Sequence, residues 1–130
     1  MNIDWSKEFP FERKSLQYVP EEPGVYQILQ SDEYQRYRGA SRILKIGASK
    51  SDLRSEIENH FVRHTAANRL ARIKNQKELL ITFAYARKSS EEAIELEKRL
   101  LREYEDKYWD LPILNSTRGY ARGEDNHYKV

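Results

Sequence analysis

A strand pattern followed almost at once by the start of a long helix constrains this chain more than any other feature. Residues 79–86 have the sequence Leu-Leu-Ile-Thr-Phe-Ala-Tyr-Ala, which is rich in strand-forming residues. Ser89 and Glu92 form the Ser-x-x-Glu pattern of a capping box, which predicts a helix that runs to about Asp106. Because a strand and a helix each bury one face, the segment predicts a core between a sheet and a helix.

Two shorter strand patterns precede this segment, at residues 24–29 and 43–47. The polar stretch between them, residues 31–41, predicts a loop, and the absence of an intervening helix predicts that the two strands are antiparallel. A helix is predicted over 51–65, followed by a second helix or a bent extension over 66–77. This order predicts an α+β fold in which a small three-stranded mixed or antiparallel sheet is flanked by helices.

The 130 residues amount to one domain, which we divide into an N-terminal arm (1–23), a folded domain (24–115) and a polar C-terminal tail (116–130). Prolines oppose a long helix in the arm, and its aromatic residues indicate that it packs on the core. The sequence has no cysteine, which excludes disulfides, thiol catalysis and zinc–thiolate sites. It shows no signal-like N-terminus and no apolar run of about 20 residues, so we expect a soluble cytoplasmic protein.

Glu97 departs from the charge pattern of the last predicted helix. It lies in the middle of an otherwise apolar stripe that consists of Ala93, Ile94, Leu96, Leu100, Leu101 and Tyr104. A carboxylate in that position is costly unless a partner or a metal ion compensates. Two interpretations have equal weight: a buried glutamate paired with an arginine or lysine, or a metal ligand or acid–base group in a cleft.

His60 and His64 lie on the apolar face of the helix predicted over 51–65, together with Leu53 and Ile57. Their i, i+4 spacing is compatible with metal binding, although such histidines are more often hydrogen-bonded core residues. We expect the core role for His64. For His60, both interpretations stay open.

Five features occur in an order that resembles the GIY-YIG nuclease domain, over roughly residues 23–117. They are Gly24-Val25-Tyr26, Lys45-Ile46-Gly47, a helix that contains His60, the inward-facing Glu97 within an Ala93-x-x-x-Glu97 pattern, and Asn115. The second motif has Lys45 where the family usually has tyrosine. Taken singly, Tyr26 could be a packing aromatic of a strand, Lys45 an exposed strand residue and Asn115 a turn residue. Their order together with Glu97 favours the nuclease-type fold.

The resemblance implies a divalent-metal-dependent endonuclease that cleaves DNA phosphodiester bonds with one Mg²⁺ or Mn²⁺ ion. It implies that Glu97 is the metal ligand and that Tyr26, near the attacking water, is a general base or proton relay. Lys45 would act in place of the second tyrosine, and Asn115 would steady the site. His60 resembles a histidine that some members have on the first helix.

One departure from the family concerns an arginine that many members have one turn before that histidine. This chain has Glu56 at that position, while Arg54 is displaced to the side of the helix face and is the nearest candidate for a phosphate clamp. Arg63 and Arg69 lie further along. A missing arginine would leave a weak or inactive nuclease, and Glu56 facing a phosphate would repel it. The alternative is therefore a nucleic-acid-binding module on a nuclease-derived fold.

A local cluster of basic residues bears on both functions. The formal net charge is only +2, so a surface that binds nucleic acid has to be local. The predicted segment 66–77 contains such a cluster, formed by Arg69, Arg72, Lys74 and Lys77. It is either a phosphate-binding surface or a solvated helix face. DNA is the expected partner, and a homodimer or a further specificity partner is compatible with a lone domain of this size.

Overall fold

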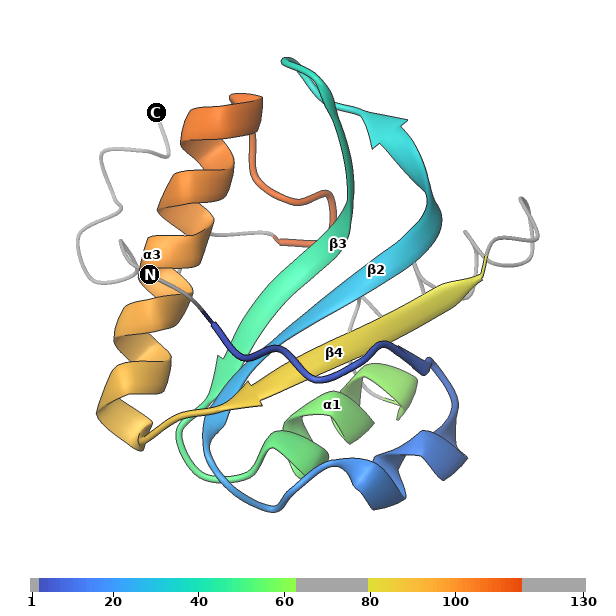
Figure 1. Ribbon diagram of the computed structural model, residues 1–130, viewed down its shortest axis with the longest axis vertical. Helices are drawn as coiled ribbons and strands as arrows, with labels where there is room; N and C mark the ends of the chain where they lie inside the picture. Colours follow the sequence, from blue (N-terminus) through green and yellow to red (C-terminus); the bar gives the residue numbers. More distant parts are fainter. Residues whose placement is uncertain (1–2, 63–79, 116–130) are drawn as a thin grey trace.

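The structure is a computed structural model, and it describes residues 3–62 and 80–115. These residues form a four-stranded antiparallel sheet with the strand order β1-β4-β2-β3 (Figure 1). The strands are β1 (Phe9–Pro10), β2 (Gly24–Gln35), β3 (Ala40–Ser49) and β4 (Ile81–Arg87). The helices are the 3₁₀ helix η1 (Arg13–Tyr18), α1 (Leu53–Val62) and α3 (Ser90–Tyr108).

The α+β prediction is confirmed, but the prediction of three strands is wrong. The additional strand, β1, comes from the arm predicted for residues 1–23 and pairs with β4, Phe9 opposite Phe83 and Pro10 opposite Thr82. A proline is tolerated there because β1 is an edge strand and the missing N–H faces away from the ladder. The arm is therefore part of the sheet, as well as packing on the core.

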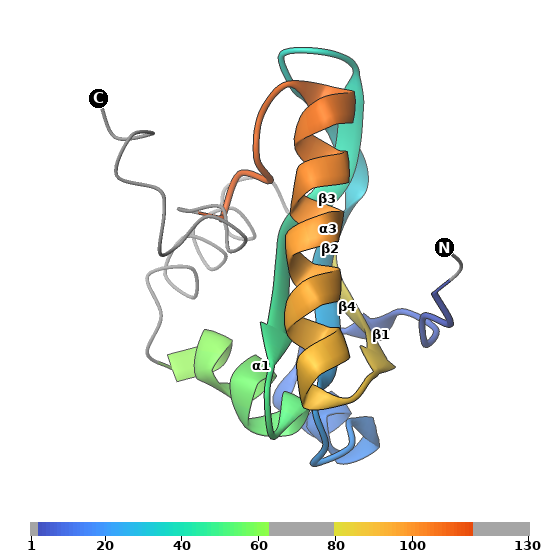
Figure 2. The same ribbon diagram turned by 90° about the vertical axis from the view of Figure 1, so that its left-hand side faces the viewer.

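The sheet has two differently covered faces. On the first, the α1 face, α1 and η1 pack on a core built from Leu16, Val19, Tyr26, Ile28, Leu44, Leu53, Ile57, Ile81, Phe83 and Leu114. On the second, the α3 face, Val25, Ile46 and Ala86 of the strands pack against α3 residues that include Ala93, Leu96 and Leu101. Figure 2 shows α3 in front of the strands and α1 below and to one side of them. Successive strand residues alternate between these two faces.

The β2–β3 hairpin is longer than the sequence predicts, and the loop expected over 31–41 is wrong. β2 continues to Gln35, β3 begins at Ala40, and a short turn containing Gly39, whose φ is 75°, joins them. β4 pairs with β2 only as far as Gln30. Beyond that point the hairpin is a two-stranded ribbon with much of its surface exposed, so polar residues are tolerated and the segment resembles a loop in sequence.

The helices predicted over 51–65 and from Ser89 onwards are confirmed as α1 and α3 within the described residues. Both hydrogen bonds of the capping box are present: the Ser89 hydroxyl accepts from the Glu92 N–H, and the Glu92 carboxylate accepts from the Ser89 N–H. The predicted apolar face of α3 includes the buried residues Ala93, Leu96, Leu101 and Tyr104. The predicted segment 66–77, His64 and the tail 116–130 lie outside the described residues. Within the described residues, no helix has the length and apolar character that a membrane crossing requires.

Candidate active site around Tyr26

Tyr26 lies on β2 at the centre of the candidate site, with 1% of its surface exposed. Its cross-strand partner on β3 is Gly47. A Cβ atom on Gly47 would lie 2.4 Å from both Cζ and the hydroxyl oxygen of Tyr26, so the ring occupies the space that any side chain would need. The two short motifs, residues 24–26 and 45–47, are therefore adjacent across the β2–β3 ladder. The ring of Tyr26 packs directly on the backbone of Gly47.

Two side chains of α1 reach the hydroxyl of Tyr26. His60 is fully buried, and its Nε2 lies 2.6 Å from the hydroxyl oxygen. Glu56 lies one turn earlier, and its Oε2 accepts a longer hydrogen bond of 3.4 Å from the same hydroxyl. Because residues four positions apart share a helix face, α1 presents both groups to β2.

The single proton of the phenol limits how these three groups share hydrogen bonds. An ionised carboxylate only accepts, so the hydroxyl donates to Glu56 and then accepts from Nε2–H of His60. In the other arrangement the hydroxyl donates to Nε2 of His60, and the bond to Glu56 is given up. The two arrangements differ in the direction of the phenol O–H and in which ring nitrogen of His60 carries its proton. The oxygen of Tyr26 can therefore act as both hydrogen-bond donor and acceptor, with one partner on either side.

Burial raises the pKa of Tyr26 well above its ordinary value, and the negative charges of Glu56 and Glu97 raise the pKa further. The phenol is therefore protonated at neutral pH. Glu97 lies on α3, which runs alongside β3 (Figures 1 and 2), and is half-buried. Its effect on the pKa of Tyr26 means that the Glu97 carboxylate is within electrostatic reach of the phenol.

Lys45 is half-buried on β3 and lies on the same side of the sheet as Tyr26. Its cross-strand partner is Ile28, which packs in the α1-face core. The β2–β3 register shifts immediately after this pair, because Leu29 lies opposite Ile43. The interposed Leu44 is buried in the same core, as expected when a bulge turns two successive side chains to one face. The side chain of Lys45 therefore lies on the α1 face of the sheet, as that of Tyr26 does.

Asn115 holds the outer edge of β3 at Ile46. Its side-chain oxygen accepts from the Ile46 N–H at 2.9 Å, and its amide nitrogen donates to the Ile46 carbonyl at 2.9 Å. The backbone N–H of Leu114 adds a bond of 2.9 Å to the carbonyl of Leu44. The segment after α3 thus forms hydrogen bonds with the backbone of β3, the edge strand, much as a further strand would. The Asn115 contact lies at Ile46, one residue before Gly47.

Replacing Asn115 by Ala is expected to lower the free energy of unfolding by about 1–3 kcal/mol, because two backbone groups of Ile46 lose their partner. Urea titration of both proteins measures the difference. Asn115→Asp keeps the volume but presents an oxygen to the Ile46 carbonyl, so it should be at least as destabilising. If Asn115→Asp unfolds at the wild-type urea concentration, the paired hydrogen bonds do not stabilise this edge.

Arg54 is engaged away from the Tyr26 hydroxyl. Its Nε donates to the carbonyl of Val19 at 2.8 Å, and its Nη1 lies 3.3 Å from a carboxylate oxygen of Glu21. These contacts tie α1 to the segment between η1 and β2. The other predicted cations of this region, Arg63, Arg69, Arg72, Lys74 and Lys77, lie outside the described residues.

The carboxylates near Tyr26 fit one kind of metal site. Mg²⁺ is usually held by one or two carboxylates, keeps several water ligands and takes the rest from a substrate phosphate. Glu97, which is half-buried on α3, would be the protein carboxylate of such a site, because Glu56 already accepts a hydrogen bond from Tyr26. Among the described residues there is no group of three or more His, Asp or Glu side chains that could enclose an ion. The chemistry of the site thus suits an open ion that is bound together with a phosphate.

Sequence reasoning does not identify the roles of Gly47 and Glu56. A glycine inside a strand pattern is the available signal for close backbone approach, and it points to Gly47 without naming Tyr26 as the group that approaches. The i, i+4 spacing from His60 is the signal for Glu56. The sequence alone suggests that Glu56 would repel a phosphate, whereas the structure has it accepting a hydrogen bond from Tyr26.

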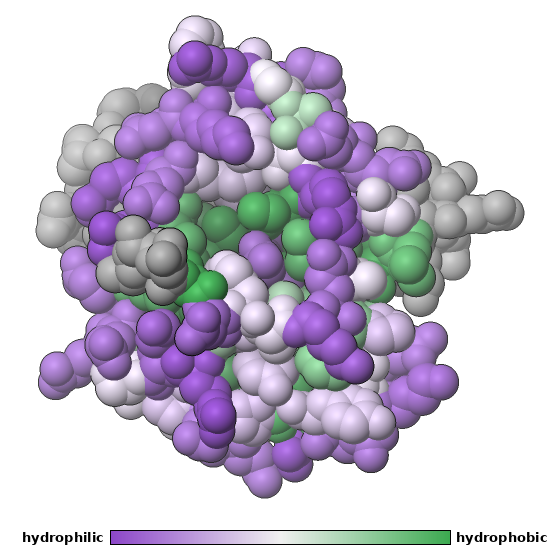
Figure 3. All heavy atoms as spheres, in the orientation of Figure 1, coloured by the Kyte–Doolittle hydropathy of each residue, from purple (hydrophilic) through white to green (hydrophobic). Residues whose placement is uncertain are grey.

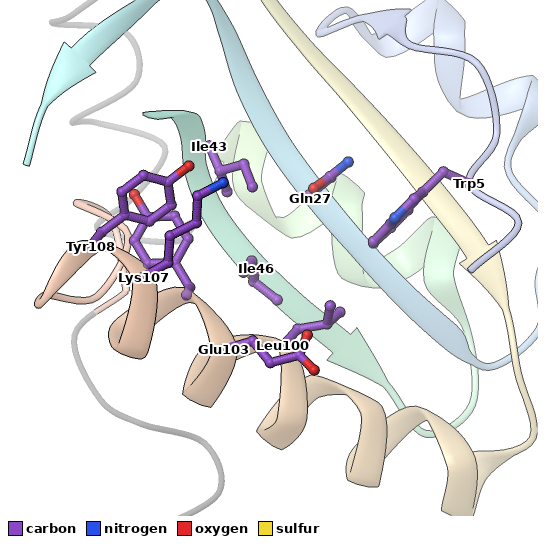
Figure 4. A pocket seen from close by; sticks show the side chains of 9 residues that line it. Trp5, Gln27, Ile43, Ile46, Leu100, Glu103, Lys107 and Tyr108 are labelled. Atoms are coloured by element: carbon purple, nitrogen blue, oxygen red, sulfur yellow. The ribbon is translucent and has the colours of Figure 1, made fainter. Parts of the chain in front are cut away.

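A hollow lies on the α3 face, away from the Tyr26 hydroxyl. It is a cavity of about 260 Å³ between α3 and the strands, with Trp5 and Tyr108 at its two ends (Figure 4). Ile46 and Leu100 are among its apolar walls. Figure 3 shows this face of the molecule, where apolar surface lies in a hollow rimmed by hydrophilic side chains. None of the residues around the Tyr26 hydroxyl lines this cavity.

Comparison of the chain with family models, with curated proteins and with solved structures gives no match. The functional assignment therefore depends on the residues around Tyr26 and on their arrangement. Those residues come from β2, β3, α1 and α3, which are distant in sequence and meet at the start of the β2–β3 hairpin.

Removing the Tyr26 hydroxyl is expected to cost about 1–3 kcal/mol of stability, because a buried imidazole nitrogen loses its hydrogen bond. The pH dependence has a definite sign. The pKa of Tyr26 is raised in the folded state, so its contribution to stability is complete below the unfolded pKa of about 10 and falls as pH rises above it. Stability of Tyr26→Phe should therefore fall less steeply than wild type above about pH 10. Urea titrations at several alkaline pH values test this.

Proposed function

We propose that this chain is a divalent-metal-dependent endonuclease that cleaves phosphodiester bonds in DNA. The observation that supports this most directly is the hydroxyl of Tyr26, held 2.6 Å from His60 and under the influence of the carboxylates of Glu56 and Glu97. Phosphodiester hydrolysis needs a group that accepts a proton from the attacking water and a metal ion that binds the phosphate. Tyr26 would provide the first, and the nearby carboxylates would hold Mg²⁺ or Mn²⁺. The order of motifs that resembles the GIY-YIG domain supports the same conclusion, and we assign the sheet and its helices to that fold on this basis.

The proposed reaction is in-line attack of a water molecule on phosphorus. The water oxygen forms a bond to phosphorus, the bond to the leaving oxygen breaks, and the water proton passes to the oxygen of Tyr26. Because the raised pKa of Tyr26 opposes a free phenolate, Tyr26 passes its own proton to Glu56 as it accepts the new one. His60 holds the phenol oxygen in place during this exchange.

The remaining groups act on the phosphate. A divalent ion held by Glu97 would polarise the phosphate and stabilise the leaving oxygen. The ammonium of Lys45, on the same side of the sheet as Tyr26, would stabilise the charge that develops on the phosphate oxygens. Asn115 holds β3 at Ile46 and so keeps Lys45 and Gly47 in register with Tyr26.

The engagement of Arg54 favours a second candidate function. Arg54 is bound to Val19 and Glu21, so the described part of α1 directs this arginine toward the N-terminal arm. A nuclease of this type without a clamping arginine would bind DNA and cleave it weakly or not at all. The alternative is therefore a nucleic-acid-binding module on a nuclease-derived fold, with the basic cluster of residues 69–77 as its phosphate contact.

The experiment that tests the proposal is incubation of the purified protein with duplex and branched DNA in Mg²⁺ or Mn²⁺. We expect nicking that a chelator abolishes, and a loss of about 10²- to 10⁴-fold in Tyr26→Phe because the relay is removed. DNA binding, measured in chelator, should weaken as salt rises, because bound phosphates release counterions. Salt-dependent binding without nicking in either metal would replace the nuclease by the binding module.

A further inference from the structure

An aromatic–cationic patch lies at the far end of the molecule from the Tyr26 site. We define it as Tyr37, Arg38, Lys107 and Trp109, contributed by the tip of the β2–β3 hairpin and the C-terminal end of α3. Tyr37 is 80% exposed and Trp109 is 63% exposed, which are the two largest values among the exposed large hydrophobic residues of the described chain. In Figure 1 this end of the hairpin and of α3 is uppermost, while α1 is at the bottom.

The patch is held by contacts between the hairpin and the helix end. The backbone N–H of Arg38 donates to the carbonyl of Tyr108 at 3.2 Å. Arg36, whose side chain is 9% exposed, lies 2.8 Å from the carboxylate of Asp110 and donates to the carbonyl of Leu111 at 2.5 Å. These bonds place the exposed side chains on a rigid base, so that binding would not have to order them first.

Trp109 occupies a backbone conformation that a bulky residue rarely adopts. It follows the last turn of α3 with φ 62° and ψ 24°, in the left-handed region where helices usually end on glycine or asparagine. The fold therefore accepts an unfavourable residue at the helix end, and this residue exposes most of its indole to solvent. Such strain without a gain in burial points to a role in recognition.

Cations flank the exposed rings. The guanidinium of Arg38 lies 5.4 Å from the centre of the Trp109 ring and covers one face of the indole, while most of the residue stays exposed. Arg38 and Lys107 also line a hollow of about 460 Å³ between the hairpin tip and α3. Glu33 is the one carboxylate that lines this hollow. Two cations against one carboxylate leave the hollow with an excess of positive charge.

We infer that this patch binds a single-stranded segment of nucleic acid. Unpaired bases would stack on the exposed rings of Trp109 and Tyr37, and Arg38 and Lys107 would contact the phosphates between them. Flat rings beside cations are the features by which proteins bind single strands without regard to sequence, since every base has a stacking face. A paired duplex hides those faces, so the patch distinguishes unpaired from paired DNA.

The inference deepens the proposed function and rests on it for the nature of the polymer. Tyr26 is near the start of β2 and the patch is beyond its end, a separation of roughly 30 Å at about 3.3 Å per strand residue. A substrate with an unpaired strand next to its duplex could thus reach both places at once. The patch would then position branched or single-strand-containing DNA at the Tyr26 site.

The test uses Trp109 as its own reporter. The sequence contains two tryptophans, so the variant Trp5→Phe leaves Trp109 as the only indole. In this background and in chelator, a single-stranded thymidine oligonucleotide should quench the tryptophan fluorescence and bind more tightly than a blunt duplex of equal length. With wild-type Trp5, Trp109→Ala and Arg38→Ala should each weaken oligonucleotide binding, the former by about 5- to 150-fold. Trp109→Phe should restore part of the loss.

Two controls separate recognition from folding and from general charge. Trp109→Gly suits the left-handed conformation, so its melting temperature should not fall below that of wild type although its oligonucleotide binding is lost. Arg87→Ala removes one exposed positive charge at the other end of the sheet and should bind within about threefold of wild type. Absence of quenching, wild-type binding by Trp109→Ala, or a preference for the duplex overturns the inference.

Nicking assays distinguish this inference from the proposed catalysis. If the wild-type protein never nicks DNA but Trp109→Ala loses oligonucleotide binding, the inferred binding patch stands and the proposed catalysis is wrong. If the wild-type protein nicks DNA and Trp109→Ala binds the oligonucleotide as well as wild type does, the proposed catalysis stands and the inferred binding patch is wrong.

Discussion

Replacing Glu97 by Gln is expected to reduce DNA nicking by at least about 10²-fold, comparable with the loss of one group that stabilises charge in a transition state. The amide has nearly the volume of the carboxylate, so the packing of α3 on the sheet is preserved. It has no negative charge, so it would bind a divalent ion far more weakly. Comparison of nicking rates at saturating Mg²⁺, together with circular dichroism to verify folding, measures the effect.

The matched control for this prediction is Glu95→Gln. Glu95 lies two residues earlier on the same helix and is exposed, so the substitution changes net charge by the same amount without reaching Tyr26. It should nick DNA at the wild-type rate. Excess Mn²⁺ should restore part of the activity of Glu97→Gln if the carboxylate binds the ion. Equal nicking by the Glu97 and Glu95 variants would rule out Glu97 as the metal ligand.

The Glu97 variant also has a consequence that does not depend on catalysis. The negative charge of Glu97 contributes to the raised pKa of Tyr26, so its removal should lower the pKa of that phenol toward the ordinary value. The decline of stability at alkaline pH, which we attribute to Tyr26, should therefore end at a lower pH in Glu97→Gln. Alkaline urea titrations thus test the electrostatic contact even if the protein proves to be a binding module.

Replacing Gly47 by Ala is expected to destabilise the protein by about 1–3 kcal/mol and to abolish nicking. The added methyl group would lie 2.4 Å from the ring of Tyr26, which has to move and give up its bond to His60. The sign is informative, because Gly→Ala within a strand is otherwise neutral or favourable. Urea titration gives the stability change, and the nicking assay reports the displacement of the hydroxyl.

A double-mutant cycle with Tyr26→Ala isolates the contact. The Tyr26 variant is itself destabilised by the cavity that it leaves, by about 3–5 kcal/mol for a large buried aromatic. In that background the methyl group of Gly47→Ala enters empty space, so its cost should vanish or change sign. If the two substitutions are additive, the ring of Tyr26 does not pack on Gly47, and the proposed arrangement of the two motifs is wrong.

The elements that sequence reasoning predicted correctly are those whose signals are local. The capping box at Ser89 and the apolar stripe of α3 depend on residues three or four positions apart, and both are confirmed. The strand-forming run after residue 79 likewise became β4. Local hydrogen bonds and helical spacing act within one or two turns, so the sequence by itself determines these elements and the α+β class.

The tertiary structure decided whatever depends on pairing between distant segments. The pairing of Phe9 with Phe83 turned part of the arm into a fourth strand, and the β2–β3 register brought Tyr26 against Gly47. Packing of α1 directed Glu56 toward Tyr26, where the sequence suggested a group that repels phosphate. Neither propensity nor periodicity specifies register or the rotation of one element on another, because both arise from side chains that meet only after the chain has folded.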